Sequence, residues 1–126
     1  MARVISDSAN LASKIAGEDL SDYQYRFVTL ESDNTVDLAD STSDYPYGVL
    51  QNYPESGCEA SVAVMGETKI AAGEALSIGY FVATDATGRG VQATSGVYAR
   101  GICVEPAGAA SDVAVIRLFD TANTVS

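Results

Sequence analysis

The sequence of 126 residues contains no histidine and no tryptophan. Without an imidazole there is no histidine general base, no histidine-ligated metal and no Ser-His-Asp triad. Without tryptophan, the chain lacks the ring on which sugars stack best, which argues against a carbohydrate-binding module. We therefore expect a protein that is not an enzyme and that holds neither a cofactor nor a metal ion.

Positive charge is scarce, because 7 lysine and arginine residues stand against 17 aspartate and glutamate residues, for a net charge of −10. Such a chain offers no basic surface for phosphates or anionic lipids, so we expect no nucleic acid and no membrane among its partners. Hydrophobic residues nevertheless make up 47% of the sequence. That share is too high for a disordered acidic chain, and the length suits one folded domain.

Cysteines are few, and long hydrophobic runs are missing. Cys58 and Cys103 lack the C-x-x-C spacing of a redox or zinc site, so we expect two free thiols in a reducing compartment. No stretch approaches the roughly 20 apolar residues of a membrane span, and the first residues lack the apolar core of a signal peptide. We expect a protein that is made in soluble form in the cytoplasm.

Apolar and polar residues alternate with a period of two from Tyr23 onward, in short runs separated by glycine-containing turns. The expected strands cover residues 23–30, 35–39, 48–52, 60–65, 67–71, 76–83, 91–94, 97–105 and 112–119. The pattern predicts an all-β domain over residues 23–120, a small antiparallel β-sandwich or barrel of about eight or nine short strands. Residues 121–126 are expected to form a C-terminal tail.

Residues 1–22 differ from this pattern and are predicted to form an N-terminal arm. Their widely spaced apolar residues are Ile5, Leu11, Ile15 and Leu20. A short helix that begins near Ser8 and ends at Gly17 is one interpretation, and a disordered tail is the other. Four apolar residues are too few for a core, so we expect the arm to pack on another surface and to contribute little to the stability of the β domain.

Three of the seven tyrosines, Tyr45, Tyr47 and Tyr53, fall in and around proline-containing loops. Loop tyrosines with an apolar body and a polar tip are enriched at protein interfaces, although they also anchor ordinary loops. Together with the apolar residues of the arm, they are the candidate interface residues.

Two further patterns have an ordinary structural explanation beside a functional one. Gly88-Arg89-Gly90 resembles part of a phosphate-binding loop, but a third glycine and a following helix are missing, which favours a hairpin turn. An acidic cluster without the spacing of a calcium-binding loop favours a solvated surface. Its members are Glu31, Asp33, Asp37, Asp40 and Asp44.

Several short patterns occur in a particular order along the chain. They are Gly48 to Asn52 with Pro54, the V-x-V-x-G-x-T-K run from Val62 to Lys69, Gly73 with Gly79, Thr84-Asp85 with Gly88, and Gly101-Ile102 with Glu105. In this order and spacing, from about Tyr25 to Leu118, the sequence resembles the head decoration, or capsid cement, proteins of tailed bacteriophages.

The resemblance implies a small, acidic, mostly β protein without catalytic residues. It implies binding to the outer surface of the expanded icosahedral head, where such proteins reinforce contacts between subunits of the major capsid protein. The implied partners are that capsid protein and further copies of the chain, as a homotrimer. The location implied is the outside of the virion.

One other class of function is compatible with the acidic sequence. An acidic inhibitor that imitates DNA presents clustered carboxylates in place of phosphates and blocks a nucleic-acid-binding protein. Residues 60–119 contain few acidic residues. The negative charge is therefore concentrated toward the N-terminal half and in loops rather than in a regular stripe, which argues mildly against this alternative.

Overall fold

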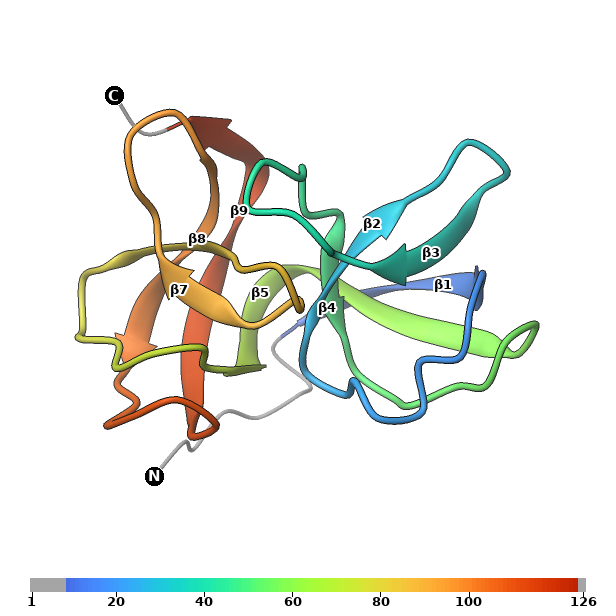
Figure 1. Ribbon diagram of the computed structural model, residues 1–126, viewed down its shortest axis with the longest axis horizontal. Coiled ribbons are helices and arrows are strands. Elements are labelled where there is room, and N and C mark those ends of the chain that lie inside the picture. The colour runs from blue at the N-terminus through green and yellow to red at the C-terminus, as the bar shows by residue number, and fades with distance from the viewer. Residues whose placement is uncertain (1–8, 125–126) are drawn as a thin grey trace.

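The computed structural model describes residues 9–124, and its nine strands are joined by turns and loops (Figure 1). The strands are β1 (Asn10–Ala16), β2 (Phe27–Leu30), β3 (Thr35–Leu38), β4 (Gly48–Leu50), β5 (Glu59–Ala71), β6 (Phe81–Thr84), β7 (Gly90–Gln92), β8 (Tyr98–Glu105) and β9 (Val113–Thr124). The expected all-β class is confirmed. In the part of the chain described, there is no helix with the length and apolarity that a membrane crossing requires.

Five strands form a closed barrel, in the order β1-β3-β2-β4-β5, with β5 pairing back to β1. Its pairs are antiparallel except for the contact between β1 and β3, where Ile15 lies opposite Thr35 in a parallel arrangement. The interior is filled by buried apolar side chains from every strand and from the loop after β1. They are Ala16, Leu20, Val28, Val36, Leu50, Ala60 and Val62.

The remaining strands extend β5 into an open antiparallel sheet, in the order β5-β9-β8-β6-β7. Figure 1 shows β5 between the barrel strands β1 to β3 on one side and β7 to β9 on the other. One face of the open sheet packs against the outside of the barrel. This second core includes Phe27, Val49 and Ala63 from the barrel and Ile70, Val82, Ile116 and Leu118 from the open sheet.

Strand β5 contributes side chains to both cores because a bulge at Gly66 reverses which face of the strand its side chains occupy. Val62 faces the barrel interior and Ile70 faces the second core, although they are eight positions apart and strict alternation would place both side chains on one face. Gly66 has φ 87°, and the pairing register with β1 shifts between Asn10 and Leu11. The sequence pattern predicted two strands broken at Gly66, and the structure instead has one strand with a bulge.

Neither interpretation of the N-terminal arm, a short helix or a disordered tail, holds for residues 10–16, because Asn10–Ala16 is strand β1. Its backbone is hydrogen-bonded along β5, from Leu11 opposite Ala63 to Ile15 opposite Glu59. A helix this short is marginal on its own, whereas the edge of β5 offers hydrogen-bond partners along this segment. Leu20 is fully buried in the barrel. The β structure therefore begins at Asn10 rather than at Tyr23, and Ile5 lies outside the described residues.

Three other boundaries differ from the sequence prediction by four or five residues. Residues 121–124 continue β9 and pair with β8, with Thr124 opposite Tyr98, so the expected tail is partly strand. Residues 23–26 form a turn before β2, where Tyr25 has φ 65°. Leu76 pairs with Ala107 only through an isolated bridge, so β6 begins later than expected.

Candidate interaction surfaces

The outward side of β1 carries two of the predicted interface residues. Leu11 is 54% exposed and Ile15 is 46% exposed, and both point outward with Ser13 because side chains alternate along a strand. The Ser13 hydroxyl donates a hydrogen bond to Glu59 on the neighbouring strand. We call Leu11, Ser13 and Ile15 the β1 strip. Leu20, predicted with them, is instead part of the barrel core.

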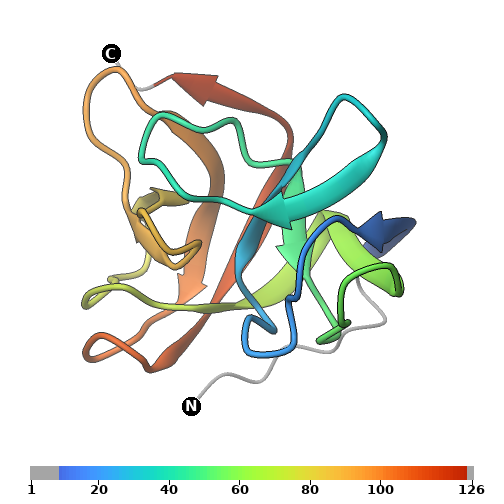
Figure 2. The same cartoon turned by 45° about the vertical axis from the view of Figure 1, so that its right-hand side comes forward.

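The three predicted tyrosines do not form one surface. Tyr45 precedes β4 and Tyr53 follows it, so their loops leave the two ends of this strand (Figure 2). Tyr45 is 47% exposed and Tyr53 is 63% exposed, and the Tyr45 ring lies edge-on to that of Tyr98, with centroids 5.1 Å apart. Tyr47 is partly buried against the barrel core, which matches ordinary loop anchoring.

A groove of about 370 Å³ lies beside β2 and β3. Its five carboxylates are Glu18, Glu31, Asp37, Asp40 and Asp44. Burial raises the pKa of Asp37, and the negative charges of Glu18 and Glu31 raise it further. No group of three carboxylate or thiol side chains among residues 9–124 is arranged to hold a metal ion. The groove is a strongly acidic face of the barrel.

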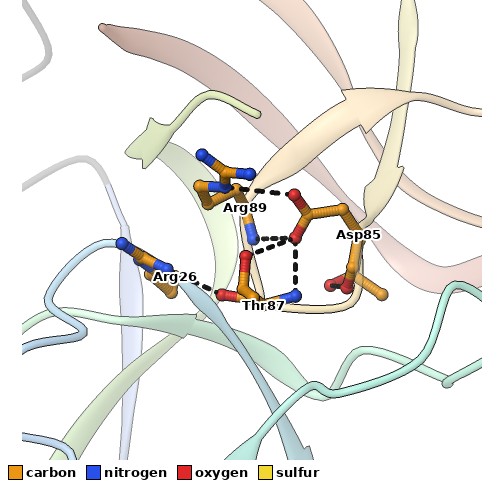
Figure 3. A network of polar contacts seen from close by, with 5 residues as sticks. Arg26, Asp85, Thr87 and Arg89 are labelled. Carbon is orange, nitrogen blue, oxygen red and sulfur yellow. Dashed lines mark hydrogen bonds and ion pairs between the residues drawn. The ribbon is translucent and has the colours of Figure 1, made fainter. Parts of the chain in front are cut away.

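The Gly88-Arg89-Gly90 segment belongs to the β6–β7 hairpin, as the turn interpretation predicted. The Asp85 carboxylate accepts hydrogen bonds from the backbone N–H groups of Thr87 and Arg89, both at 2.8 Å, and pairs with the Arg89 guanidinium at 3.1 Å (Figure 3). Burial raises the pKa of Asp85, but these donors and the Thr87 hydroxyl outweigh it, so the pKa lies below its usual range.

The tip of this hairpin docks directly on the barrel. The Arg26 guanidinium donates to the Thr87 carbonyl at 2.9 Å, and the Phe27 N–H donates to the Gly88 carbonyl at 2.7 Å. Gly88 has φ 77°, and a Cβ there would lie 2.6 Å from a methyl carbon of Leu38. Only glycine fits this position. The turn is therefore a structural joint between the open sheet and the barrel.

The open sheet carries an exposed apolar surface that the sequence interpretation missed. Phe81, Ile102 and Arg117 are direct cross-strand neighbours on β6, β8 and β9. Phe81 is 49% exposed, and its ring lies edge-on to Phe119 at a centroid distance of 5.9 Å. We call Phe81, Ile102, Arg117 and Phe119 the Phe81 face. Only the strand order reveals it, because these residues come from three separate segments.

The model of the phage cement protein family matches residues 24–118, which is most of the chain. The chain belongs to the phage cement protein family. The head fiber gp8.5 N base of bacteriophage phi29 has a similar structure, with a TM-score of 0.69 and 14% identity over 92% of this cement protein and 98% of that chain. This likeness shows a shared fold. A comparison with curated proteins finds no match.

Membership supports a structural, capsid-associated role for this cement protein. Two of the patterns that carried the resemblance have structural tasks here. The run from Val62 to Lys69 contains the Gly66 bulge, through which β5 joins the two cores. Thr84-Asp85 with Gly88 forms the joint between sheet and barrel. These two patterns therefore stabilise the fold of the cement protein, and its contact surfaces have to be identified from side chains that are exposed.

Proposed function

We propose that this protein is a non-enzymatic virion component that binds the outer surface of the expanded phage head and reinforces contacts between major capsid subunits. The observation that carries the proposal is the cement family match over residues 24–118. A fold shared with a phage head fiber base supports it. Synthesis in the host cytoplasm, before attachment to the head, is consistent with the free thiols of Cys58 and Cys103.

The β1 strip is the proposed contact with the capsid or with a neighbouring copy. Leu11 and Ile15 leave about half of their surface in water, and covering it gains about 25 cal/mol per Å² of apolar area. The strip lies on a strand whose backbone is fixed by β5, so little ordering is needed on binding. Tyr45 and Tyr53 are proposed as additional contacts at the two ends of β4.

A homotrimer on the capsid is the proposed arrangement. An icosahedral shell offers many identical sites, and a symmetric oligomer gains affinity by engaging several of them at once. The net charge of −10 keeps decorated particles apart in solution. The acidic groove beside β2 and β3 supplies part of this charge.

Sedimentation with purified heads tests the proposal. The protein should pellet with expanded heads and not with unexpanded shells, because the binding surface is proposed to be that of the expanded form. If the protein pellets with neither, the proposed binding to the head is wrong. The double variant Leu11→Thr, Ile15→Thr should require roughly tenfold more protein for half-saturation, since it removes two apolar anchors. Leu30→Thr, at an exposed apolar position on β2, is the matched control.

A further inference from the structure

The Phe81 face presents a fixed apolar surface with one cation within it. Phe81, Ile102 and Arg117 follow one another across three paired strands. The edge-on contact with Phe119 holds the Phe81 ring, although half of that side chain is in contact with water. A partner that covers this ring would immobilise few additional rotamers, which lowers the entropic cost of binding.

Arg117 differs from the other cations that the structure describes, because it has no hydrogen bond, ion pair or ring contact. The others have such contacts: Lys14 with Asn34, Arg26 with the Thr87 carbonyl, Lys69 with the Tyr25 ring, Arg89 with Asp85, and Arg100 with backbone carbonyls. Glu67 is the cross-strand neighbour of Arg117 on β5, yet the two side chains form no ion pair. Arg117 is exposed and remains available to a partner.

Arginine beside aromatic rings is a frequent composition for the energetic centre of a protein interface. A guanidinium in an apolar setting is best matched by a carboxylate, which it binds through two parallel hydrogen bonds. We propose that the Phe81 face is a capsid contact, and that the matching surface of the major capsid protein is apolar and carries a carboxylate. This inference rests on the proposed function and assigns it a second contact surface.

A second copy of the chain fits the Phe81 face less well than a capsid subunit does. A twofold contact between two such faces would bring the Arg117 guanidinium groups of both copies into one interface, and every copy carries a net charge of −10. The β1 strip lies on the barrel, and the Phe81 face lies on the open sheet, with β9 and β8 between β5 and β6. Two contacts on separate halves of the molecule allow one copy to bridge two capsid subunits.

Titration of expanded heads with purified variants tests this contact. Phe81→Thr keeps a residue that favours strands, and Arg117→Glu reverses the charge; each should raise the protein concentration for half-saturation by tenfold or more. The effect of Arg117→Glu should shrink at high salt, because added ions screen the charge pair. Leu30→Thr, at an exposed apolar position on the barrel, should bind as the unmodified protein does.

The outcomes separate this inference from the proposed function. If the unmodified protein binds and both variants bind equally well, the Phe81 face is not a contact, while the cement function stands. If the unmodified protein fails to bind, the proposed function is wrong, and this inference with it. Sedimentation velocity of the protein without heads measures whether copies associate with one another. An oligomer that Phe81→Thr dissociates would assign the face to contacts between copies and overturn the proposal.

Discussion

The guanidinium of Arg100 in β8 donates a hydrogen bond to the backbone carbonyl of Val64 in β5 at 2.9 Å. It also donates to the carbonyls of Pro46 at 3.1 Å and Tyr47 at 2.9 Å, and to that of Phe119. Arg100 is only 4% exposed. One buried side chain thus joins the barrel, the loop before β4 and the open sheet, and Figure 2 shows that loop reaching toward β8 and β9.

Replacement of Arg100 should strongly destabilise the fold. We expect Arg100→Met to lower the free energy of unfolding by about 3 kcal/mol or more, because buried carbonyls lose their donors. Arg100→Lys should be more stable than Arg100→Met but less stable than the unmodified protein, since one ammonium cannot reproduce the planar fork of donors in a guanidinium. Urea unfolding followed by circular dichroism measures both. The exposed Arg117→Met is the control, expected within about 0.5 kcal/mol of the unmodified protein. A loss below about 1 kcal/mol for Arg100→Met would contradict this assignment.

Asp85 should make stability depend on pH. Its pKa lies below the usual value near 3.8, so the folded state binds this proton less tightly than the unfolded state does. The stabilisation is present above that value and is lost as the pH falls through the folded pKa. Asp85→Asn should therefore be less stable than the unmodified protein at about pH 7, by about 1–3 kcal/mol for the lost charged acceptor. The difference should shrink by about pH 3.

The comparison with Asp85→Asn is needed because Asp37 changes the stability with pH in the opposite direction from Asp85. Burial and neighbouring carboxylates raise the pKa of Asp37, so its protonation favours the folded state as the pH falls. The pH profile of the unmodified protein alone mixes the two effects. A stability difference between the variant and the unmodified protein that stays constant down to about pH 3 would show that the Asp85 carboxylate is not responsible.

Removal of the N-terminal segment should damage the fold. The sequence predicted that residues 1–20 add little to the β domain, but β1 closes the barrel and Leu20 is fully buried. Leu20→Ala should cost about 2–5 kcal/mol of unfolding free energy, the usual range for a buried leucine. Ile15→Ala, on the exposed side of β1, should cost clearly less. Equal melting temperatures for the full chain and a chain lacking residues 1–20 would contradict this account.

The two thiols should react at very different rates. Cys58 is exposed, whereas Cys103 is buried, and burial raises the pKa of the Cys103 thiol. Alkylation without reductant should modify Cys58 quickly in the folded protein and Cys103 only after denaturation, because the thiolate is the reactive form. Mass measurement checks this. If neither thiol reacts in denaturant, the two are joined by a disulfide.

The local alternation of residues was sufficient to predict the class and most strands. The apolar runs bounded by glycine-containing turns matched β8 and most of β9, and the turn after Asp85 is encoded by its own carboxylate and by Gly88. Strand β1 was missed for a physical reason. Leu11 and Ile15 are four residues apart, a spacing that places two residues on one face of a helix and equally on one face of a strand. The choice between helix and strand depends on pairing with β5, which is far away in the sequence.

The contact surfaces were harder to predict than the fold. Leu11 and Ile15 proved to be exposed, but Leu20 has the same apolar character and lies in the core. Only the position in the barrel separates them. The Phe81 face depends on which strands are neighbours, and that order is fixed by long-range pairing rather than by any local pattern. The loop tyrosines looked alike in sequence and differ in burial for the same reason.

A density map of expanded heads decorated with this protein tests the central claim most directly. The account predicts the nine-stranded domain on the outer surface, in contact with two neighbouring major capsid subunits through the β1 strip and the Phe81 face. Single copies or pairs at twofold positions would overturn the trimer and leave the cement function intact. Density on the inside of the shell, or a domain that touches one capsid subunit and bridges none, would contradict the proposed reinforcement of subunit contacts.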